Sequence, residues 1–204
     1  VKKHLALRPD FNLLDAFAIF DKTGNGWLHY FDIIDELKKL SMIISNEEGR
    51  LFMIRYDKNR DQRLDYSEFS RAFTPLSDKA SALLHSKSYV SITDDQLNGF
   101  DAFSYETRFL DAFKVHFEIE RAAEQWRQSI NRLYTLSPRN AFISLGAKGE
   151  KGYLKAKHFD KLFKQFNINL SKYELDLLVI RFTGNPEHKK IYYTQFVDEL
   201  IPRS

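Results

Sequence analysis

Twelve residues from Asp57 to Glu68, DKNRDQRLDYSE, place oxygen-bearing side chains in the order that a calcium ion requires. Calcium takes about six to eight oxygen ligands, usually including one carboxylate that binds through both of its oxygens. The side chains at the first, third, fifth, ninth and twelfth places, and the residue at the seventh that offers its backbone carbonyl, are Asp57, Asn59, Asp61, Asp65, Glu68 and Arg63. We therefore predict a calcium site here. The alternative is a loop held by its own hydrogen bonds.

Gln62 is the one departure from the pattern in this window. The sixth place needs a left-handed backbone with positive φ, which glycine adopts without strain. Glutamine adopts it at a cost of about 1–2 kcal/mol. We expect calcium binding to survive with reduced affinity.

A second window lies 36 residues upstream, DKTGNGWLHYFD from Asp21 to Asp32. Its candidate ligands are the side chains of Asp21, Thr23, Asn25 and Asp32 and the carbonyl of Trp27. Gly26 stands where the turn needs glycine, but the carboxylate of Asp32 is one methylene shorter than that of glutamate. His29 at the ninth place is a poor calcium ligand. This window predicts a weaker calcium site, or one that favours magnesium, which tolerates fewer protein ligands.

The aliphatic residues at the loop centres reveal an internal repeat. Leu28, Leu64, Leu154 and Ile191 are separated by 36, 90 and 37 residues, so the chain contains two paired units. The sequence predicts an all-α fold in which a long helical segment joins the two pairs. Within each pair, a short two-strand bridge is expected between the loops.

The two loops of the second pair lack the ligands. Their first, third, fifth and twelfth places hold Ala147, Gly149, Lys151 and His158 in one loop and Gly184, Pro186, His188 and Gln195 in the other. Both are predicted to be metal-free and to serve packing or partner binding. The predicted segments are 1–75, a calcium-binding pair; 76–138, a linker and long helix; and 139–204, a degenerate pair.

Helical spacing predicts helices over Pro9–Phe20, Asn46–Tyr56 and Ser104–Tyr134. Ser45 and Glu48 form a capping-box pattern before the second of these. The third either packs on the second pair or bridges the two pairs, or it acts as a target helix. A target helix would place Phe113, Phe117 and Trp126 in a groove of the first pair or of another protein. Its charged residues are taken to be solvated: Glu118, Glu120, Arg121, Glu124, Arg127 and Arg132.

Composition limits the other functions. The chain has 204 residues, 43% of them hydrophobic, and a net charge of +3. It contains no Cys, which excludes disulfides and thiol catalysis, and its six His show no metal-ligand spacing. With no phosphate-binding glycine loop either, we expect no enzyme. No apolar run is long enough to span a membrane, and no signal peptide opens the chain. The first residue is Val, which leaves open a processed chain or a piece of a longer one.

Lysines concentrate in the last third of the chain: Lys148, Lys151, Lys155, Lys157, Lys161 and Lys164. Such a surface can meet an acidic filament, a nucleic acid or membrane headgroups, or it can simply be solvated. Beyond charge, nothing in the sequence indicates specific nucleic-acid binding.

The segments 10–75 and 139–202 resemble the EF-hand family, and four-hand calmodulin-like proteins in particular. The resemblance rests on DKNRDQRLDYSEF and DKTGNGWLHYFD, and on the hydrophobic frames of LGAKGEKGYLKAKHFDKLFKQF and RFTGNPEHKKIYYTQF. It implies two pairs of hands and a groove that opens with calcium. The expected function is a calcium-responsive protein–protein interaction module in a larger assembly, with a cytoskeletal filament or an amphipathic helix as partner. The alternatives are a cytoskeletal or axonemal scaffold that uses its hands as packing units, and the regulatory piece of a larger enzyme. The expected location is the cytoplasm, with the cytoskeleton or a cilium left open.

Overall fold

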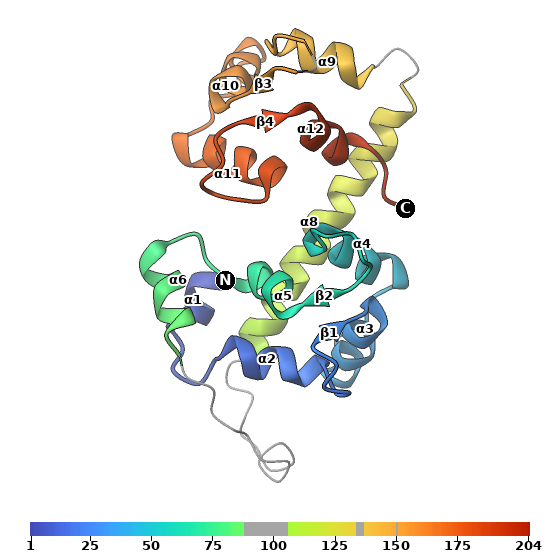
Figure 1. Cartoon of the computed structure of the whole chain (residues 1–204), viewed down its shortest axis with the longest axis vertical. Helices are drawn as coiled ribbons and strands as arrows, with labels where there is room; N and C mark the ends of the chain where they lie inside the picture. Colours follow the sequence, from blue (N-terminus) through green and yellow to red (C-terminus); the bar gives the residue numbers. More distant parts are fainter. Residues whose placement is uncertain (88–105, 134–136, 150) are drawn as a thin grey trace. The chain divides into compact units, whose positions relative to one another are not determined.

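The computed structural model describes residues 1–87, 106–133, 137–149 and 151–204. Over these residues the chain forms eleven helices and two small antiparallel sheets, as the all-α prediction requires (Figure 1). The elements are α1 Lys2–Leu7, α2 Leu13–Phe20, β1 Trp27–Leu28, α3 Tyr30–Lys39, α4 Asn46–Tyr56, β2 Leu64–Asp65, α5 Tyr66–Phe73, α6 Asp78–His85, α8 Glu106–Asn131, α9 Pro138–Ser144, β3 Tyr153–Leu154, α10 Ala156–Gln165, α11 Lys172–Thr183, β4 Ile191–Tyr192 and α12 Tyr193–Leu200. None of these helices is both long and apolar enough to cross a bilayer.

The chain divides into two compact units. Unit 1 comprises residues 1–123 with 203–204, and unit 2 comprises residues 124–202, so that α8 contributes to both. The segment boundaries expected after residues 75 and 138 stay a prediction. Part of the expected linker, and both ends of the expected helix Ser104–Tyr134, lie outside the described residues.

The two loops of unit 1 are joined by a short antiparallel bridge. Trp27 of β1 pairs with Asp65 of β2, and Leu28 pairs with Leu64. Leu28 and Leu64 are fully buried, because successive strand residues face opposite sides and these two face the core. One loop connects α2 to α3 and the other connects α4 to α5.

Helix starts in unit 1 follow local capping chemistry. The capping box of Ser45 and Glu48 at α4 is present as predicted. The predicted start of α2 at Pro9 is wrong, because Asn12 accepts a hydrogen bond from the backbone N–H of Leu14 and starts the helix at Leu13. The pattern also missed α1, which packs on α6 with Leu5 and Ala6 buried.

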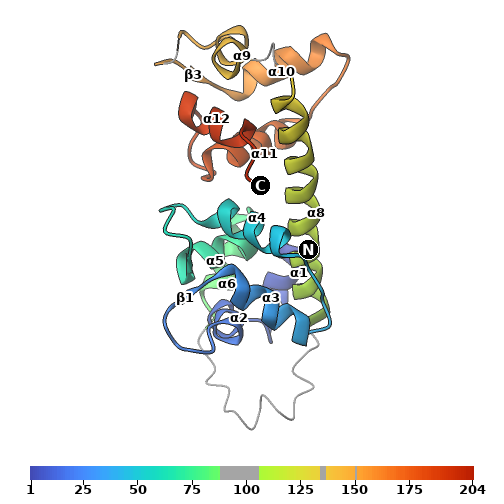
Figure 2. The same cartoon turned by 90° about the vertical axis from the view of Figure 1, so that its right-hand side faces the viewer.

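The first half of α8 is part of the core of unit 1. This half of the helix lies beside α2, α4 and α5 (Figures 1 and 2). Its Phe109, Phe113 and Phe117 contact aromatic residues of those helices. Phe113 has no exposed surface, and its ring centroid lies 5.3 Å from that of Phe52 and 4.9 Å from that of Phe73. The burial of these rings makes the first half of α8 part of the core of unit 1.

Unit 2 repeats the frame with a smaller core. Leu154 of β3 pairs with Ile191 of β4, as predicted, and both are fully buried. Ser171 caps α11, because its side chain accepts a hydrogen bond from the backbone N–H of Glu174. Phe142, Phe159 and Phe196 form the aromatic part of its core.

Candidate metal-binding loops and the helix packed on unit 1

The carboxylate of Asp57 organises the first half of the loop from Asp57 to Glu68. Its Oδ1 accepts hydrogen bonds from the backbone N–H groups of Arg60 and Asp61, at 2.6 and 3.2 Å. Its Oδ2 accepts from the N–H of Gln62 at 2.9 Å. Asn59 donates through Nδ2 to Oδ2 of Asp61 at 2.9 Å. The structure thus brings the first, third and fifth places together.

Glu68 reaches from α5 back to the start of the same loop. Its Oε1 accepts from the backbone N–H of Lys58 at 2.7 Å, and its Oε2 accepts from the N–H of Asp65 at 3.3 Å. Asp65 in turn accepts from the N–H of Glu68 through Oδ1 at 2.7 Å, which completes a capping box. The side chain of Glu68 is buried at 5% exposure. The twelfth-place carboxylate therefore already lies inside the loop.

The backbone at the sixth place has the conformation that the loop needs. Gln62 has φ of 64°, and Gly26 at the same place of the other loop has φ of 80°. Gln62 therefore adopts the left-handed conformation that is expected to cost about 1–2 kcal/mol. Arg63, one residue on, places its guanidinium 4.1 Å from the ring centroid of Trp27, so the seventh places of the two loops are in contact.

The loop from Asp21 to Asp32 gathers its first three candidate side chains. Asn25 donates through Nδ2 to Oγ1 of Thr23 at 2.7 Å, and Thr23 lies 3.4 Å from Oδ1 of Asp21. Asp32 accepts from the backbone N–H of His29 at 2.7 Å, within the capping box of α3. His29, the ninth place, is the N-cap residue of α3. The shorter carboxylate thus has a helix-capping role, whereas Glu68 also spans its loop.

Among the described residues, nowhere do three or more His, Asp or Glu side chains come close enough to hold a metal ion as they stand. The carboxylate oxygens of both loops instead accept hydrogen bonds from loop backbone N–H groups. The residue types still fit calcium, because the donor set is all oxygen and the sixth-place backbone is in the left-handed region. All eleven ligand positions that the sequence indicates in the two loops stay predictions.

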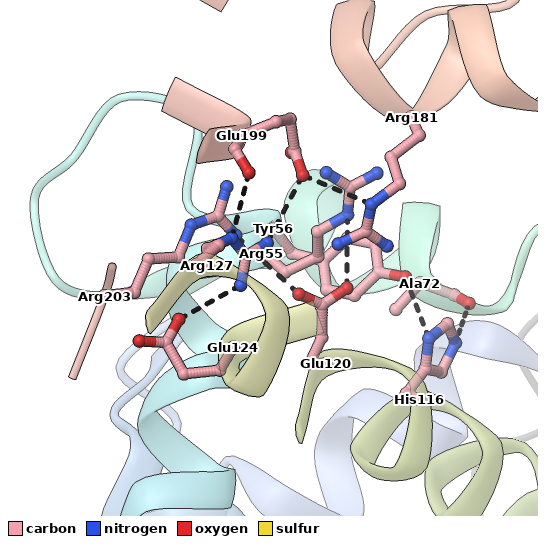
Figure 3. Close-up of polar contacts among 10 residues, drawn as sticks. All are labelled: Arg55, Tyr56, Ala72, His116, Glu120, Glu124, Arg127, Arg181, Glu199 and Arg203. Atoms are coloured by element: carbon pink, nitrogen blue, oxygen red, sulfur yellow. Dashed lines mark hydrogen bonds and ion pairs between the residues drawn. The ribbon is translucent and has the colours of Figure 1, made fainter. Parts of the chain in front are cut away.

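A partly buried histidine joins α8 to the helices of the first pair. Nδ1 of His116 lies 3.0 Å from the hydroxyl oxygen of Tyr56, and its Nε2 lies 2.8 Å from the carbonyl oxygen of Ala72 (Figure 3). Since a carbonyl only accepts, Nε2 carries the proton and Nδ1 accepts from Tyr56. Burial, and then the charge of Lys2, lower the pKa of His116 to about 3. The imidazole is therefore neutral in the folded protein.

Three charged residues of the expected polar face of α8 are buried, so the prediction is wrong for them. Glu120, Glu124 and Arg127 were expected to be solvated, yet they are only 4%, 2% and 2% exposed. From Phe109 they continue the buried stripe of the helix in steps of four and three residues. That spacing was visible in the sequence, but the change from apolar to charged residues concealed it.

Each half of α8 pairs these charges within its own unit. In unit 1, Glu120 lies 3.8 Å from the guanidinium groups of both Arg55 and Arg203. In unit 2, Arg127 lies 3.2 Å from Glu124 and 3.3 Å from Glu199 (Figure 3). Buried charges need such partners, because removing them from water is costly.

In the target-helix alternative, Trp126 enters a groove together with Phe113 and Phe117. It is 71% exposed, whereas the two phenylalanines are buried in unit 1. Beyond Phe117 the buried stripe continues through Glu120, Glu124 and Arg127, and Trp126 lies outside it. The structure therefore buries Phe113 and Phe117 in the core of unit 1 and leaves Trp126 exposed, so the alternative is wrong for Trp126.

The two loops of unit 2 are bridged like those of unit 1, but they have different residues at the twelfth place. At the twelfth place, His158 accepts through Nδ1 from the backbone N–H of Lys155 at 3.0 Å. Gln195 accepts in the same way from the N–H of Tyr192, also at 3.0 Å. That both loops are metal-free stays a prediction.

Part of the chain is similar to a known calcium-binding protein. No family model matches the chain. A segment of 66 residues, 31% of the chain, is 32% identical to a protein of Arabidopsis thaliana named calcium-binding protein CML42. The match spans about a third of that relative, 35% of its length. The similarity extends to a calcium-binding protein but covers too little of either chain to assign a family.

Proposed function

We propose that this chain is an EF-hand calcium-binding protein whose main site is the loop Asp57–Glu68. The observation that carries the proposal is the position of Glu68, which reaches from the twelfth place to the backbone of Lys58 at the loop entrance. Calcium would replace the N–H donors that Asp57 and Glu68 now engage, with Asn59, Asp61, Asp65 and the Arg63 carbonyl completing the shell. The partial similarity to a calcium-binding relative supports the same conclusion.

The second loop, Asp21–Asp32, is proposed to bind calcium more weakly or to prefer magnesium. Asp32 would have to leave its capping contact with His29 or draw α3 closer to become a bidentate ligand. Glu68 needs less movement, because it is longer and already lies inside its loop. We therefore expect one dominant calcium site.

Calorimetric titration of the intact chain tests this proposal. Glu68→Gln removes one negative oxygen and should weaken calcium binding by more than about tenfold, which corresponds to about 1.4 kcal/mol. Glu174→Gln is the matched control, since Glu174 closes the capping box of α11 with Ser171 but belongs to no loop. A Glu68→Gln variant that titrates like the parent chain would refute the site assignment.

We further propose that calcium governs how unit 1 holds α8, and thereby how the protein binds a partner. The aromatic residues of α8 occupy the apolar face that a target helix would need, since Phe113 packs on Phe52 and Phe73. In a sensor, calcium would loosen this packing and release the face for another protein. Hydrogen exchange at residues 109–117 should then quicken with calcium.

The completeness of that packing favours a second candidate, a structural role. Phe109, Phe113 and Phe117 are all at most 3% exposed, which is the packing of a permanent core. In this case calcium stiffens the first pair, and hydrogen exchange at residues 109–117 slows or stays unchanged. The same experiment therefore separates a sensor from a scaffold.

A further inference from the structure

The third loop of the chain lines a cavity of about 390 Å³ that the proposed calcium sites do not use. This volume lies in the range of small-ligand pockets, about 300–1,000 Å³. Its lining residues are Gly146, Lys148, Lys151, Gly152, Tyr153, Lys155, Lys157 and His158, which we call the lysine pocket. The four lysines give its lining a formal charge of +4. The single acid of the loop sequence, Glu150, lies outside the described residues.

The lysines of this pocket are not neutralised by the protein in the part that the structure describes. No described carboxylate forms an ion pair with Lys148, Lys151, Lys155 or Lys157, whereas Lys164, about two turns further along α10, pairs with Asp160 at 2.8 Å. Lys155 instead lies 5.4 Å from the ring centroid of Tyr153. Four cations gathered around one cavity repel one another, and a bound anion relieves that repulsion.

His158 adds a hydrogen-bond donor to the same cavity. Its Nδ1 accepts from the backbone N–H of Lys155 at 3.0 Å, so the neutral ring carries its proton on Nε2. The Nε2 edge faces Gly146, where an added Cβ would lie 3.6 Å from it. The twelfth residue of the loop Asp57–Glu68 has only acceptor oxygens in its side chain. The twelfth residue of this loop, His158, also has a donor, its Nε2–H.

The electrostatic environment of His158 agrees with this reading. Burial lowers the pKa of His158, and the charges of Lys157, Lys155 and Lys161 lower it further. These lysines come from the start of α10 and the residue before it, while Lys148 and Lys151 approach from the loop. Lys190 of the neighbouring segment lies over the Tyr153 ring at 4.6 Å. The pocket is thus surrounded by positive charge from several directions.

We propose that the lysine pocket binds a small anion carrying two or more phosphate groups, with its lysines as counter-charges and His158 donating from Nε2. Multiple phosphates match both the charge of the lining and a cavity larger than one ion requires. The degenerate loop would then be an anion site built on the backbone frame of a cation site. The phosphate groups come either from a free metabolite or from a lipid headgroup.

Calorimetry of the intact chain with sodium pyrophosphate, in calcium-free buffer, tests the proposal. Pyrophosphate should bind more tightly than inorganic phosphate, and the double variant Lys151→Gln/Lys157→Gln should weaken binding by about tenfold or more. The matched control is Lys164→Gln/Lys172→Gln, which removes the same charge from unit 2 outside the pocket lining. Lys151→Arg/Lys157→Arg keeps the charge and should retain binding. Circular dichroism and thermal unfolding establish that the variants fold.

A second measurement reads the site directly. Saturating pyrophosphate should raise the pKa of His158 in an NMR titration, because an adjacent anion favours the imidazolium. Vesicles that contain an inositol bisphosphate lipid distinguish the sources. Binding that pyrophosphate competes away indicates a headgroup, and absence of vesicle binding indicates a free anion. Equal losses in the pocket and control variants, an unmoved His158 or no pyrophosphate binding would each overturn the proposal.

Discussion

In each of the four loops, the twelfth residue accepts a hydrogen bond from the backbone N–H three residues earlier. The accepting side chains are Asp32, Glu68, His158 and Gln195. The residue at the twelfth place therefore caps the helix that begins in its loop, and a carboxylate, an imidazole or an amide each fulfils this role. Only unit 1 has acids at this place, and only a carboxylate can bind calcium there through two oxygens. The two units together show that the backbone structure of such a loop does not depend on the residues that would bind an ion.

The bridges between the loops lead to the same conclusion. Leu28 with Leu64, and Leu154 with Ile191, form fully buried cross-strand pairs in the two units. Burial of these aliphatic pairs holds the loops together whatever charges surround them. What differs is the aromatic core, since unit 1 has an additional helix segment, residues 106–123, packed into it.

The largest predicted effect tests that difference in the cores. Phe113→Ala should lower the free energy of unfolding of unit 1 by about 3–5 kcal/mol, because it empties a fully buried site among several rings. Urea unfolding followed by Trp27 fluorescence, in a Trp126→Phe background, measures it. Phe166→Ala, at a position that is 68% exposed, is the control and should change little. A loss below about 1 kcal/mol for Phe113→Ala would mean that α8 is not part of the core of unit 1 in solution.

Sequence reasoning found the loops and missed part of the helix, for a physical reason. Ligand spacing and buried aliphatics are local patterns, and the bridges and the Ser45 cap followed from them. The buried face of α8 was recognised only as far as Phe117, because Glu120 and Arg127 are buried through ion pairs with residues distant in the sequence. Partners of that kind, like the acceptor of His116, depend on tertiary packing.

The next effect uses His116, the partly buried histidine of unit 1. Its folded pKa is about 3 and its unfolded value is about 6.5, so the unfolded state binds more protons between these values. Stability is therefore complete above pH 6.5 and falls as the pH decreases toward 3, by about 2 kcal/mol at pH 5. Urea unfolding of the parent chain and His116→Gln at pH 7 and pH 5 isolates this contribution.

The Gln variant should lose the part of the pH dependence that belongs to His116. The other five histidines remain in both proteins, so their titration cancels in the difference. Equal pH slopes in the two proteins would show that His116 is accessible to protons in the folded state. The proposed neutral bridge from Tyr56 to Ala72 would then be wrong.

A smaller effect separates the two roles of the twelfth place. Gln195→Ala should lower the stability of unit 2 by about 1 kcal/mol, because the N–H of Tyr192 loses its acceptor. Gln195→Glu keeps the acceptor and should retain stability. Thermal unfolding measures both, and calcium titration should be unchanged for both. A calcium response that changes with Gln195→Ala would contradict the separation of frame from ion chemistry.

The smallest effect concerns the one residue that distinguishes the two sixth places of unit 1. Gln62 and Gly26 share the left-handed region, where glutamine costs about 1–2 kcal/mol more than glycine. Glycine in turn loses about 0.5–1 kcal/mol through the greater freedom of the unfolded chain. Gln62→Gly should therefore stabilise unit 1 by a net amount of about 0.5–1 kcal/mol, measured by urea unfolding in chelator. Gln62→Ala, which keeps a Cβ, gains no such relief and serves as the control. If both variants unfold like the parent chain, backbone strain at the sixth place does not distinguish the two loops, and their difference rests on the ligand residues.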